Sequence, residues 1–151
     1  MTVRRLLAGK PGEVSVIRSD VLVQDAIDQL EADDVAALVV SDNEKTIQGI
    51  ISAGDIVRGL KAFGRDVVDR PIGSLMTRNV ISCDIGESMS RIYELMDLHQ
   101  IRHVPITRDG ELCGVINMLD VVKYRLDEIK AEAEAMKEYI AGRPAYAPPV
   151  R

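Results

Sequence analysis

The chain has 151 residues and a net charge of −5, and with one Phe and no Trp its core must come from Val, Ile, Leu, Met and Ala. The acidic balance argues against nucleic-acid binding, and no apolar run reaches the ~20 residues of a membrane span or forms a secretory signal behind Met1. Cys83 and Cys113 lack metal-ligand spacing, so we expect reduced thiols in a cytoplasmic protein, with a disulfide between them as the alternative.

The first half of the chain predicts a short helix followed by alternating strands and helices. Apolar side chains between Val23 and Leu30 recur at the spacing of one buried helix face. Residues 35–40 are apolar throughout, which is typical of a strand covered on both faces. We expect a helix at 3–8 ended by the break at 9–12, a strand at 14–16, a helix at 22–32, strands at 35–40 and from Gly49, and a polar linker at 61–70.

The second half predicts the same order of elements. Apolar side chains between Met89 and Met96 again have helical spacing, and Ser88 is placed to cap that helix. Pro105 has no N–H to donate, so its strand is expected to be an edge strand or irregular, and Asp109-Gly110 predicts a tight hairpin turn. We expect a short segment at 72–76, a strand at 80–82, a helix at 88–100 and strands at 101–106 and 112–116.

The two halves are copies of one unit, related by a shift of 66 positions that becomes 65 after a polar turn. Each copy closes on the same element, Gly49-Ile50-Ile51-Ser52-Ala53-Gly54-Asp55 in the first and Gly114-Val115-Ile116-Asn117-Met118-Leu119-Asp120 in the second. This duplication and the repeated Gly–apolar–apolar–(Ser/Asn)–x–x–Asp pattern resemble the CBS domain, the cystathionine-β-synthase repeat, over roughly residues 3–126.

The resemblance implies an α/β fold of two βαββα repeats related by pseudo-two-fold symmetry, with a long C-terminal helix added. We expect the first repeat at residues 1–66, the second at 67–128, and a C-terminal helix extension and tail at 129–151.

Each closing element has two chemical interpretations. Ser52 with Asp55, and Asn117 with Asp120, have the spacing of a helix N-cap and its third residue, so capping alone explains both pairs. Alternatively, the N–H groups at a helix N-terminus bind phosphate, while a carboxylate accepts hydrogen bonds from two vicinal ribose hydroxyls. The spacing leaves both interpretations open.

The CBS resemblance favours a nucleotide. In CBS pairs the Ser or Thr of this motif typically faces the phosphate, the Asp holds the ribose, and adenine lies in an apolar slot beside the first strand. The resemblance therefore implies one site at Ser52 and Asp55 and a second at Asn117 and Asp120, where Asn replaces the usual hydroxyl.

Four further residues are implied for the second copy's site. Arg102 would contact phosphate with His103 beside it, Thr77 would lie at the adenine end, and Ile81 would line the apolar slot. The alternatives are an exposed strand charge for Arg102, a hydrogen-bonded strand-end residue for His103 and a helix-terminus residue for Thr77. Arg58 and Lys123, one turn after each Asp, could reach phosphate, but a solvated helix face is the preferred interpretation.

The C-terminal helix, expected from Leu119 to Ala141, extends beyond the repeat. Its apolar residues step by four and three, which is an a/d heptad seam over nearly three heptads. The seam consists of Val122, Leu126, Ile129, Ala133, Met136 and Ile140. The helix could fold back on its own domain or pair with a second chain. Gly142 and Pro144 are expected to end it, with residues 143–151 as a tail.

Together with these patterns, the CBS resemblance implies a cytoplasmic regulatory sensor that binds an adenosine nucleotide and acts through an unidentified protein or a change of oligomer. AMP or NAD(H) is favoured as the ligand, with ADP, ATP and S-adenosylmethionine as alternatives. We expect a homodimer because of the C-terminal helix. We expect no metal and no enzyme activity, since no residues stand at the spacing of metal ligands or of a nucleophile with its base. The alternative function is a ligand-free interaction or dimerisation module.

Overall fold

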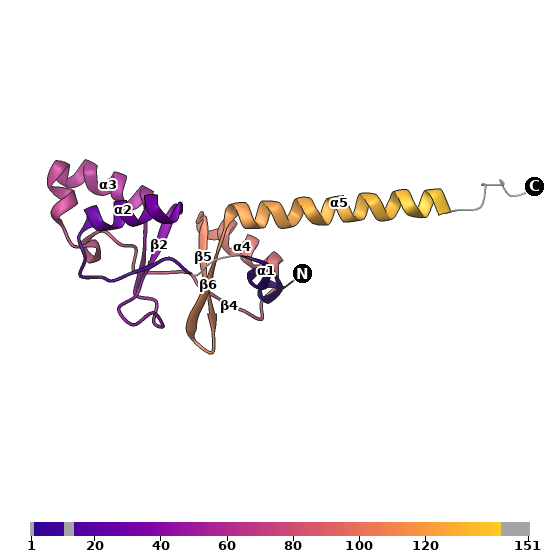
Figure 1. The fold of residues 1–151 in the computed structure, drawn as a ribbon, viewed down its shortest axis with the longest axis horizontal. Coiled ribbons are helices and arrows are strands. Elements are labelled where there is room, and N and C mark those ends of the chain that lie inside the picture. Colours follow the sequence, from indigo (N-terminus) through magenta and orange to yellow (C-terminus); the bar gives the residue numbers. More distant parts are fainter. Residues whose placement is uncertain (1, 11–13, 143–151) are drawn as a thin grey trace, which may run out of the picture. The chain divides into compact units, whose positions relative to one another are not determined.

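The computed structural model describes residues 2–10 and 14–142 and has a mixed α/β fold with two three-stranded sheets (Figure 1). The chain divides into two units, residues 1–117 and 118–151. Within residues 1–117 each sheet belongs to one copy of the repeat, so the predicted pair of βαββα repeats is confirmed. Part of the expected break, at Pro11 and Gly12, and the expected tail at 143–151 lie outside the described residues.

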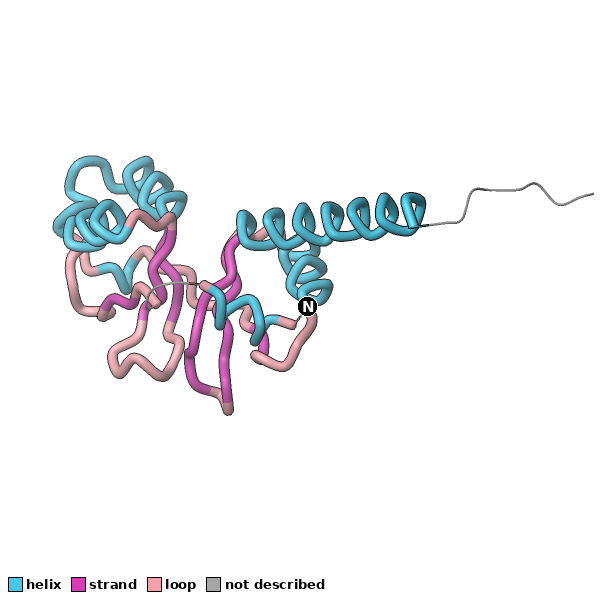
Figure 2. The backbone as a smooth tube through the Cα atoms, turned by 45° about the vertical axis from the view of Figure 1, so that its right-hand side comes forward, coloured by secondary structure: helices cyan, strands magenta, loops and turns pink. Residues whose placement is uncertain are grey.

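The first repeat contains a sheet in which β1 runs parallel to β2 and β2 pairs antiparallel with β3. Leu38, Val39 and Val40 in β2 are buried, as the apolar run predicted. Helices α2 and α3 lie together beside this sheet (Figure 2). The elements are α1 (Val3–Gly9), β1 (Val16–Ile17), α2 (Val23–Asp33), β2 (Ala37–Val40), β3 (Gly49–Ser52), α3 (Ala53–Phe63) and the 3-10 helix η1 (Gly64–Asp69).

The second repeat has the same sheet order, with β4 parallel to β5 and β5 antiparallel to β6. Ser88 caps α4 by accepting the Arg91 N–H, as predicted. The β5–β6 turn has positive φ at Asp109 and Gly110, which confirms the tight hairpin. The elements are the 3-10 helix η2 (Ile72–Ser74), β4 (Cys83–Asp84), α4 (Met89–His99), β5 (His103–Arg108), β6 (Glu111–Asn117) and, in the other unit, α5 (Met118–Gly142).

The first strand of each repeat begins later than predicted. β1 starts at Val16 rather than residue 14, and β4 starts at Cys83 rather than residue 80. In the first repeat the Val39 N–H donates to the Ser15 carbonyl, but the position equivalent to Val39 is Pro105, which has no N–H. The second ladder therefore opens one position later, at Cys83 opposite Ile106, and Ile81 lies outside any strand.

Pro105 does not lie on an edge strand, so that part of the prediction was wrong. β5 is the middle strand of its sheet, and it tolerates proline because β4 has not yet begun opposite that residue. The expected irregularity is confirmed, since the β5–β6 register shifts between Ile106 and Thr107.

The predicted linker between the repeats, residues 61–70, is mostly helical. α3 continues to Phe63 and η1 follows it, with Val67 buried. The Arg70 guanidinium lies 3.6 Å from the centre of the Phe63 ring, a favourable cation–π contact. The segment is therefore ordered from one repeat to the next.

The N-terminal segment of each repeat packs on the other repeat. The Val3 N–H of α1 donates to the Glu87 carbonyl in the second repeat, and the Ile72 N–H of η2 donates to the Val21 carbonyl in the first. Ile72 and Met76 belong to the buried core of the first repeat. The two repeats are thus tied together by crossed segments.

α5 is one continuous helix of 25 residues and confirms the predicted long C-terminal helix. The large apolar side chains of its heptad seam are exposed over 44% to 61% of their surface. Among the described helices, none is long and apolar enough to cross a membrane.

Candidate ligand site at the start of α3

The β3–α3 junction is built by reciprocal hydrogen bonds between Ser52 and Asp55. Ser52 is the N-cap of α3 and its Oγ accepts the Asp55 N–H at 3.2 Å. Asp55 Oδ2 in turn accepts the Ser52 N–H at 2.9 Å and the Ser52 Oγ–H at 3.0 Å. The predicted capping arrangement is therefore present, and it holds the Asp55 carboxylate in one orientation.

Asp55 is a buried carboxylate, only 6% exposed. Its second oxygen, Oδ1, accepts from Arg58 Nη2 at 2.6 Å and from Thr77 Oγ1 at 3.1 Å. A carboxylate offers about four acceptor positions, and all four are used here. The Asp55 carboxylate is thus fully hydrogen-bonded and faces the first turn of a helix.

Thr77 lies at the first motif, whereas the sequence assigned it to the second copy's site. The Thr77 N–H donates to the Ile50 carbonyl at 2.8 Å and the Ile50 N–H donates to the Thr77 carbonyl at 2.9 Å. A Cβ at Gly49 would lie 2.8 Å from the Thr77 carbonyl oxygen, so only glycine permits this close approach. The segment that contains Thr77 packs against the first repeat, which is why this residue lies at the first motif and not at the second.

At the second motif, the structure pairs His103 with Asn117 across β5 and β6. Arg102 precedes β5 and is exposed, and Ile81 is half-buried in the segment before β4. Asp120 lies in the first turn of α5, three residues after Asn117.

Lys10 occupies the place at the second motif that Thr77 occupies at the first. Its Nζ donates to the Val115 carbonyl at 2.9 Å, two residues before Asn117. Its position follows from the same crossing, because Lys10 directly follows α1. The second motif thus receives a cation where the first receives a hydroxyl.

The contact that the sequence missed is Arg58 with Asp55. Arg58 does lie on a solvated helix face, as the preferred interpretation predicted, but its guanidinium also turns back to the carboxylate three residues earlier. An Asp and an Arg at i and i+3 on a helix are neighbours, and this spacing was the available signal.

The opposite end of the first sheet carries a separate hollow of about 310 Å³. It is lined by Val16, Ile17, Arg18, Ser41, Asp42, Asn43 and Glu44. The polar side chains of this lining bond mostly to residues of the same loops; Asn43 Oδ1, for example, accepts from Ser41 Oγ, Lys45 N–H and Thr46 N–H, and Asp42 accepts from Ser19 and Gln48. The hollow is thus part of an internally hydrogen-bonded loop.

Neither cysteine forms a disulfide. Cys83 is buried, Cys113 is exposed, and both are free thiols, as the sequence predicted. Desolvation by the surrounding protein raises the pKa of both thiols, which keeps them protonated at neutral pH. Within the described part of the chain, no group of three or more His, Cys, Asp or Glu side chains is arranged to hold a metal ion.

Taken together, the fold and the two helix starts define a tandem α/β repeat protein with an Asp in the first turn of the last helix of each repeat. The family model for the CBS domain matches residues 12–62 and 72–127. The chain belongs to the CBS domain family.

Known proteins of similar sequence and structure support this assignment. The mitochondrial CBS domain-containing protein CBSX3 of Arabidopsis thaliana is 29% identical over 128 residues, which are 82% of this chain and 62% of the relative, so the chain spans less than two thirds of that protein. The CBS-domain protein ATU1752 of Agrobacterium tumefaciens is 31% identical with a TM-score of 0.79, over 83% of this chain and 99% of that one.

Two structures of lower identity contain adenosine compounds. PAE2072 of Pyrobaculum aerophilum, in complex with AMP, has 22% identity and a TM-score of 0.70 over 80% of this chain and 89% of that one. The CBS domain pair of protein MJ0100, in complex with 5′-methylthioadenosine and S-adenosyl-L-methionine, has 22% identity and a TM-score of 0.74 over 85% and 98%. At this identity the likeness concerns the fold.

Proposed function

We propose that the chain is a regulatory, non-catalytic CBS pair that binds an adenosine nucleotide at the start of α3. The observation that carries the proposal is the buried Asp55 carboxylate, held at a helix N-terminus beside the hydroxyls of Ser52 and Thr77. Such an acceptor suits vicinal ribose hydroxyls, and the N-terminus of α3 suits a phosphate. AMP is the preferred ligand and NAD(H) the next, before ADP, ATP and S-adenosylmethionine.

A second, unequal site is proposed at the second motif. Asn117 and Asp120 would take the roles of Ser52 and Asp55. Arg102 and His103 would lie near the phosphate, and Ile81 would contact the adenine. Ligand binding would alter a homodimer or an unidentified protein partner in the cytoplasm by shifting the population of conformations.

Thermal unfolding against a ligand panel tests this function. The panel is AMP, ADP, ATP, NAD+, NADH and S-adenosylmethionine, each added to protein shown to be free of copurified nucleotide. A ligand at 100 times its Kd adds about 2.7 kcal/mol, which raises the Tm of a chain of this size by roughly 5–10 °C. We expect the largest shift with AMP; no shift with any ligand would overturn the proposal.

Asp55→Asn then tests the site, measured by calorimetric titration at a temperature where the variant is folded. The change removes the charge that accepts the ribose hydroxyls, and we expect AMP affinity to fall by about 10- to 100-fold, since hydrogen bonds to charged groups contribute about 1.5–3 kcal/mol. Asp25→Asn is the matched control, because Asp25 caps α2 by accepting the Leu22 N–H and lies outside the site. An equal loss of AMP affinity in both variants would mean that Asp55 acts only as a helix cap.

The second candidate function is a dimerisation module without a ligand. The exposed apolar seam of α5 supports it, because such a stripe is ordinarily covered by another helix. Its signature would be a dimer that no nucleotide stabilises and that Ile129→Asp dissociates, as measured by sedimentation. A nucleotide-dependent Tm shift retained in that monomeric variant would favour the sensor instead.

A further inference from the structure

Arg58 is held over the N-terminal turn of α3 by a single strong contact. Its Nη2 lies 2.6 Å from Asp55 Oδ1, and its side chain is 72% exposed while that of Asp55 is 7% exposed. A Cβ built on Gly54 would lie 3.3 Å from Arg58 Nη1 and 3.6 Å from Ser52 Oγ. The guanidinium therefore covers the helix start on the solvent side of the buried carboxylate.

This position is electrostatically unfavourable for a cation. The N-terminus of a helix carries a partial positive charge, which disfavours a nearby cation and favours an anion. Asp55 is what offsets this cost for Arg58. A phosphate at the same helix start would satisfy both the helix and the guanidinium, whose planar fork matches phosphate oxygens.

The hydrogen bonds of Asp55 show which partner must give way to a ribose. The Ser52 N–H belongs to the backbone of the helix cap and cannot turn away from Asp55. The Ser52 hydroxyl is held in place because its oxygen also accepts the Asp55 N–H. On Oδ1 the partners are the Thr77 hydroxyl, which can rotate, and Arg58, which reaches in from solvent. Rotation of Thr77 frees one acceptor position on Oδ1, so two ribose hydroxyls can both reach this oxygen only when Arg58 leaves it as well.

We propose that Arg58 is the residue by which the first site selects phosphorylated nucleosides. This inference rests on the proposed nucleotide function. Without ligand, the Arg58 guanidinium occupies the acceptor that ribose needs. A nucleotide supplies a phosphate at the start of α3, Arg58 moves from Asp55 to that phosphate, and Asp55 is released to the ribose. A bare nucleoside must displace Arg58 without giving it a new partner, so it binds weakly.

The test compares AMP with adenosine by calorimetric titration. All variants carry Asp120→Ala, which removes the proposed second site, and each is checked for native unfolding temperature. With Arg58 intact, we expect AMP to bind at least 10-fold more tightly than adenosine. In Arg58→Gln we expect AMP to weaken and adenosine to tighten, each several-fold, so that the ratio of the two affinities falls at least 10-fold. Arg58→Lys keeps the charge but loses the planar fork, so its ratio of affinities should lie between those of the parent and of Arg58→Gln.

Lys61→Gln is the matched control, because it removes the same charge from an exposed position on α3 one turn further from the site. Its ratio should equal that of the parent. Equal ratios in Arg58→Gln and Lys61→Gln would overturn the role of Arg58 while leaving the nucleotide site standing. Equal weakening of both ligands in Arg58→Gln would show a merely structural residue. Failure of the parent to bind either compound, with the Asp120→Ala protein folded, would overturn the first site and this inference together.

Discussion

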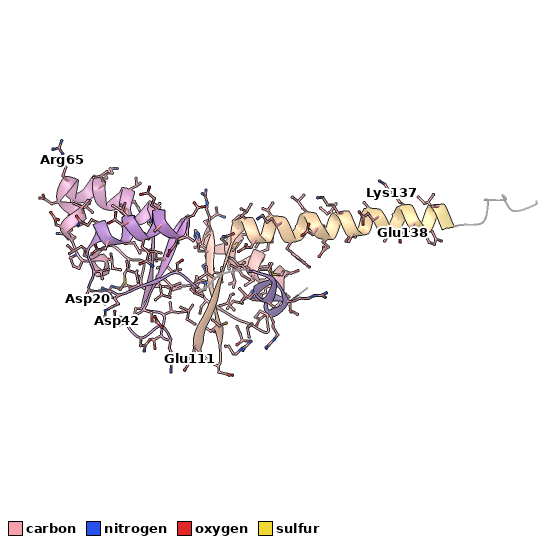
Figure 3. The ribbon with its side chains drawn as sticks, in the orientation of Figure 1. Asp20, Asp42, Arg65, Glu111, Lys137 and Glu138 are labelled. Carbon is pink, nitrogen blue, oxygen red and sulfur yellow. The ribbon has the colours of Figure 1, made fainter. Side chains whose placement is uncertain are left out.

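At the scale of single residues, Asp42 fixes the loop after β2 to the loop after β1. Asp42 Oδ1 accepts the Ser19 N–H at 2.9 Å, Oδ2 accepts from Gln48 Nε2 at 2.9 Å, and the Ser19 hydroxyl lies 3.0 Å from both oxygens. Figure 3 labels Asp42 and Asp20 at this end of the first repeat. The Ser19 backbone N–H is the main cause that holds the pKa of Asp42 below its usual value, followed by the Gln48 side chain.

The lowered pKa of Asp42 makes stability depend on pH. A carboxyl whose pKa is lower in the folded than in the unfolded protein stabilises the fold above its unfolded pKa of about 3.9, and this contribution is lost as the pH falls through the folded value. We expect Asp42→Ala to lower the free energy of unfolding at pH 7 and to have a smaller effect at pH 3, as measured by urea denaturation. Asp28→Ala, an exposed carboxylate on α2, is the control and should show neither effect. A loss at pH 3 as large as at pH 7 would contradict the assignment.

The residues of the candidate site differ in how far the sequence could predict them. The i, i+3 spacing of Ser52 and Asp55 predicted the cap, because capping depends only on local geometry. The partnership of Thr77 with Asp55 joins residues from the two copies, and no local pattern shows which copy a crossing segment reaches. The Arg58 contact was within reach of the spacing, but solvent and carboxylate compete for an exposed guanidinium, and the pattern does not decide between them.

At the scale of elements, the charges flanking the α5 seam predict how two copies would pair. Continuing the heptad places Lys123, Lys130 and Lys137 at the e positions and Arg125 and Glu132 at g positions. In an antiparallel pair e faces e, so lysines would oppose lysines. In a parallel pair g faces e of the next heptad, which puts Glu132 opposite Lys137 of the second copy.

A parallel pair also places Arg125 near Lys130, but that repulsion is reduced within the helix. Arg125 Nη1 forms an ion pair with Glu128 Oε1, and Glu128 also accepts from the Tyr124 hydroxyl. The tyrosine and arginine bonds lower the pKa of Glu128, so it stays ionised as a partner for Arg125. The charge pattern therefore favours a parallel homodimer over an antiparallel one.

Cysteine cross-linking tests the orientation. In a Cys113→Ser background, Met136→Cys places a thiol at a d position that faces its own copy only in a parallel pair, so mild oxidation should give a covalent dimer on a denaturing gel. Adding Ile129→Asp should abolish it. Glu132→Lys should weaken the dimer several-fold, since two exposed pairs at about 0.2–1 kcal/mol each are lost, and Lys137→Glu added to it should restore affinity. A dimer in solution without the cross-link would contradict the parallel arrangement.

The elements themselves were largely predictable because periodicity reports burial. The heptad gave α5, and the apolar spacing gave α2 and α4 to within a residue or two. The short strands β1 and β4 were misplaced because their limits depend on hydrogen bonds to β2 and β5, which are distant in sequence. Pro105 shows this most clearly: it shortens β4, an element it does not belong to.

At the scale of the whole molecule, the crossed segments make each repeat depend on the other. α1 is the first element of the first repeat, but Val3 is fully buried and bonded to the second repeat, and a Cβ at Gly114 would lie 2.8 Å from the Leu7 side chain. η2 closes the first core in the same way. The sequence showed two similar halves but not this exchange, because an apolar helix face does not specify which of two similar cores it covers.

Hydrogen exchange of the Val3→Ala variant tests directly whether α1 packs on the second repeat. Removing two methyl groups from a fully buried side chain should lower the free energy of unfolding by about 1–3 kcal/mol. If α1 closes the second repeat, the earliest loss of amide protection should appear in α4 and β6, far along the chain from the substitution, while α2 and β2 exchange more slowly. Met76→Ala is the mirror control, since Met76 lies in the second half of the sequence but in the first core, and its loss should appear first in α2 and β2. Exchange that rises first in the repeat next to each substitution in sequence would mean that the segments do not cross.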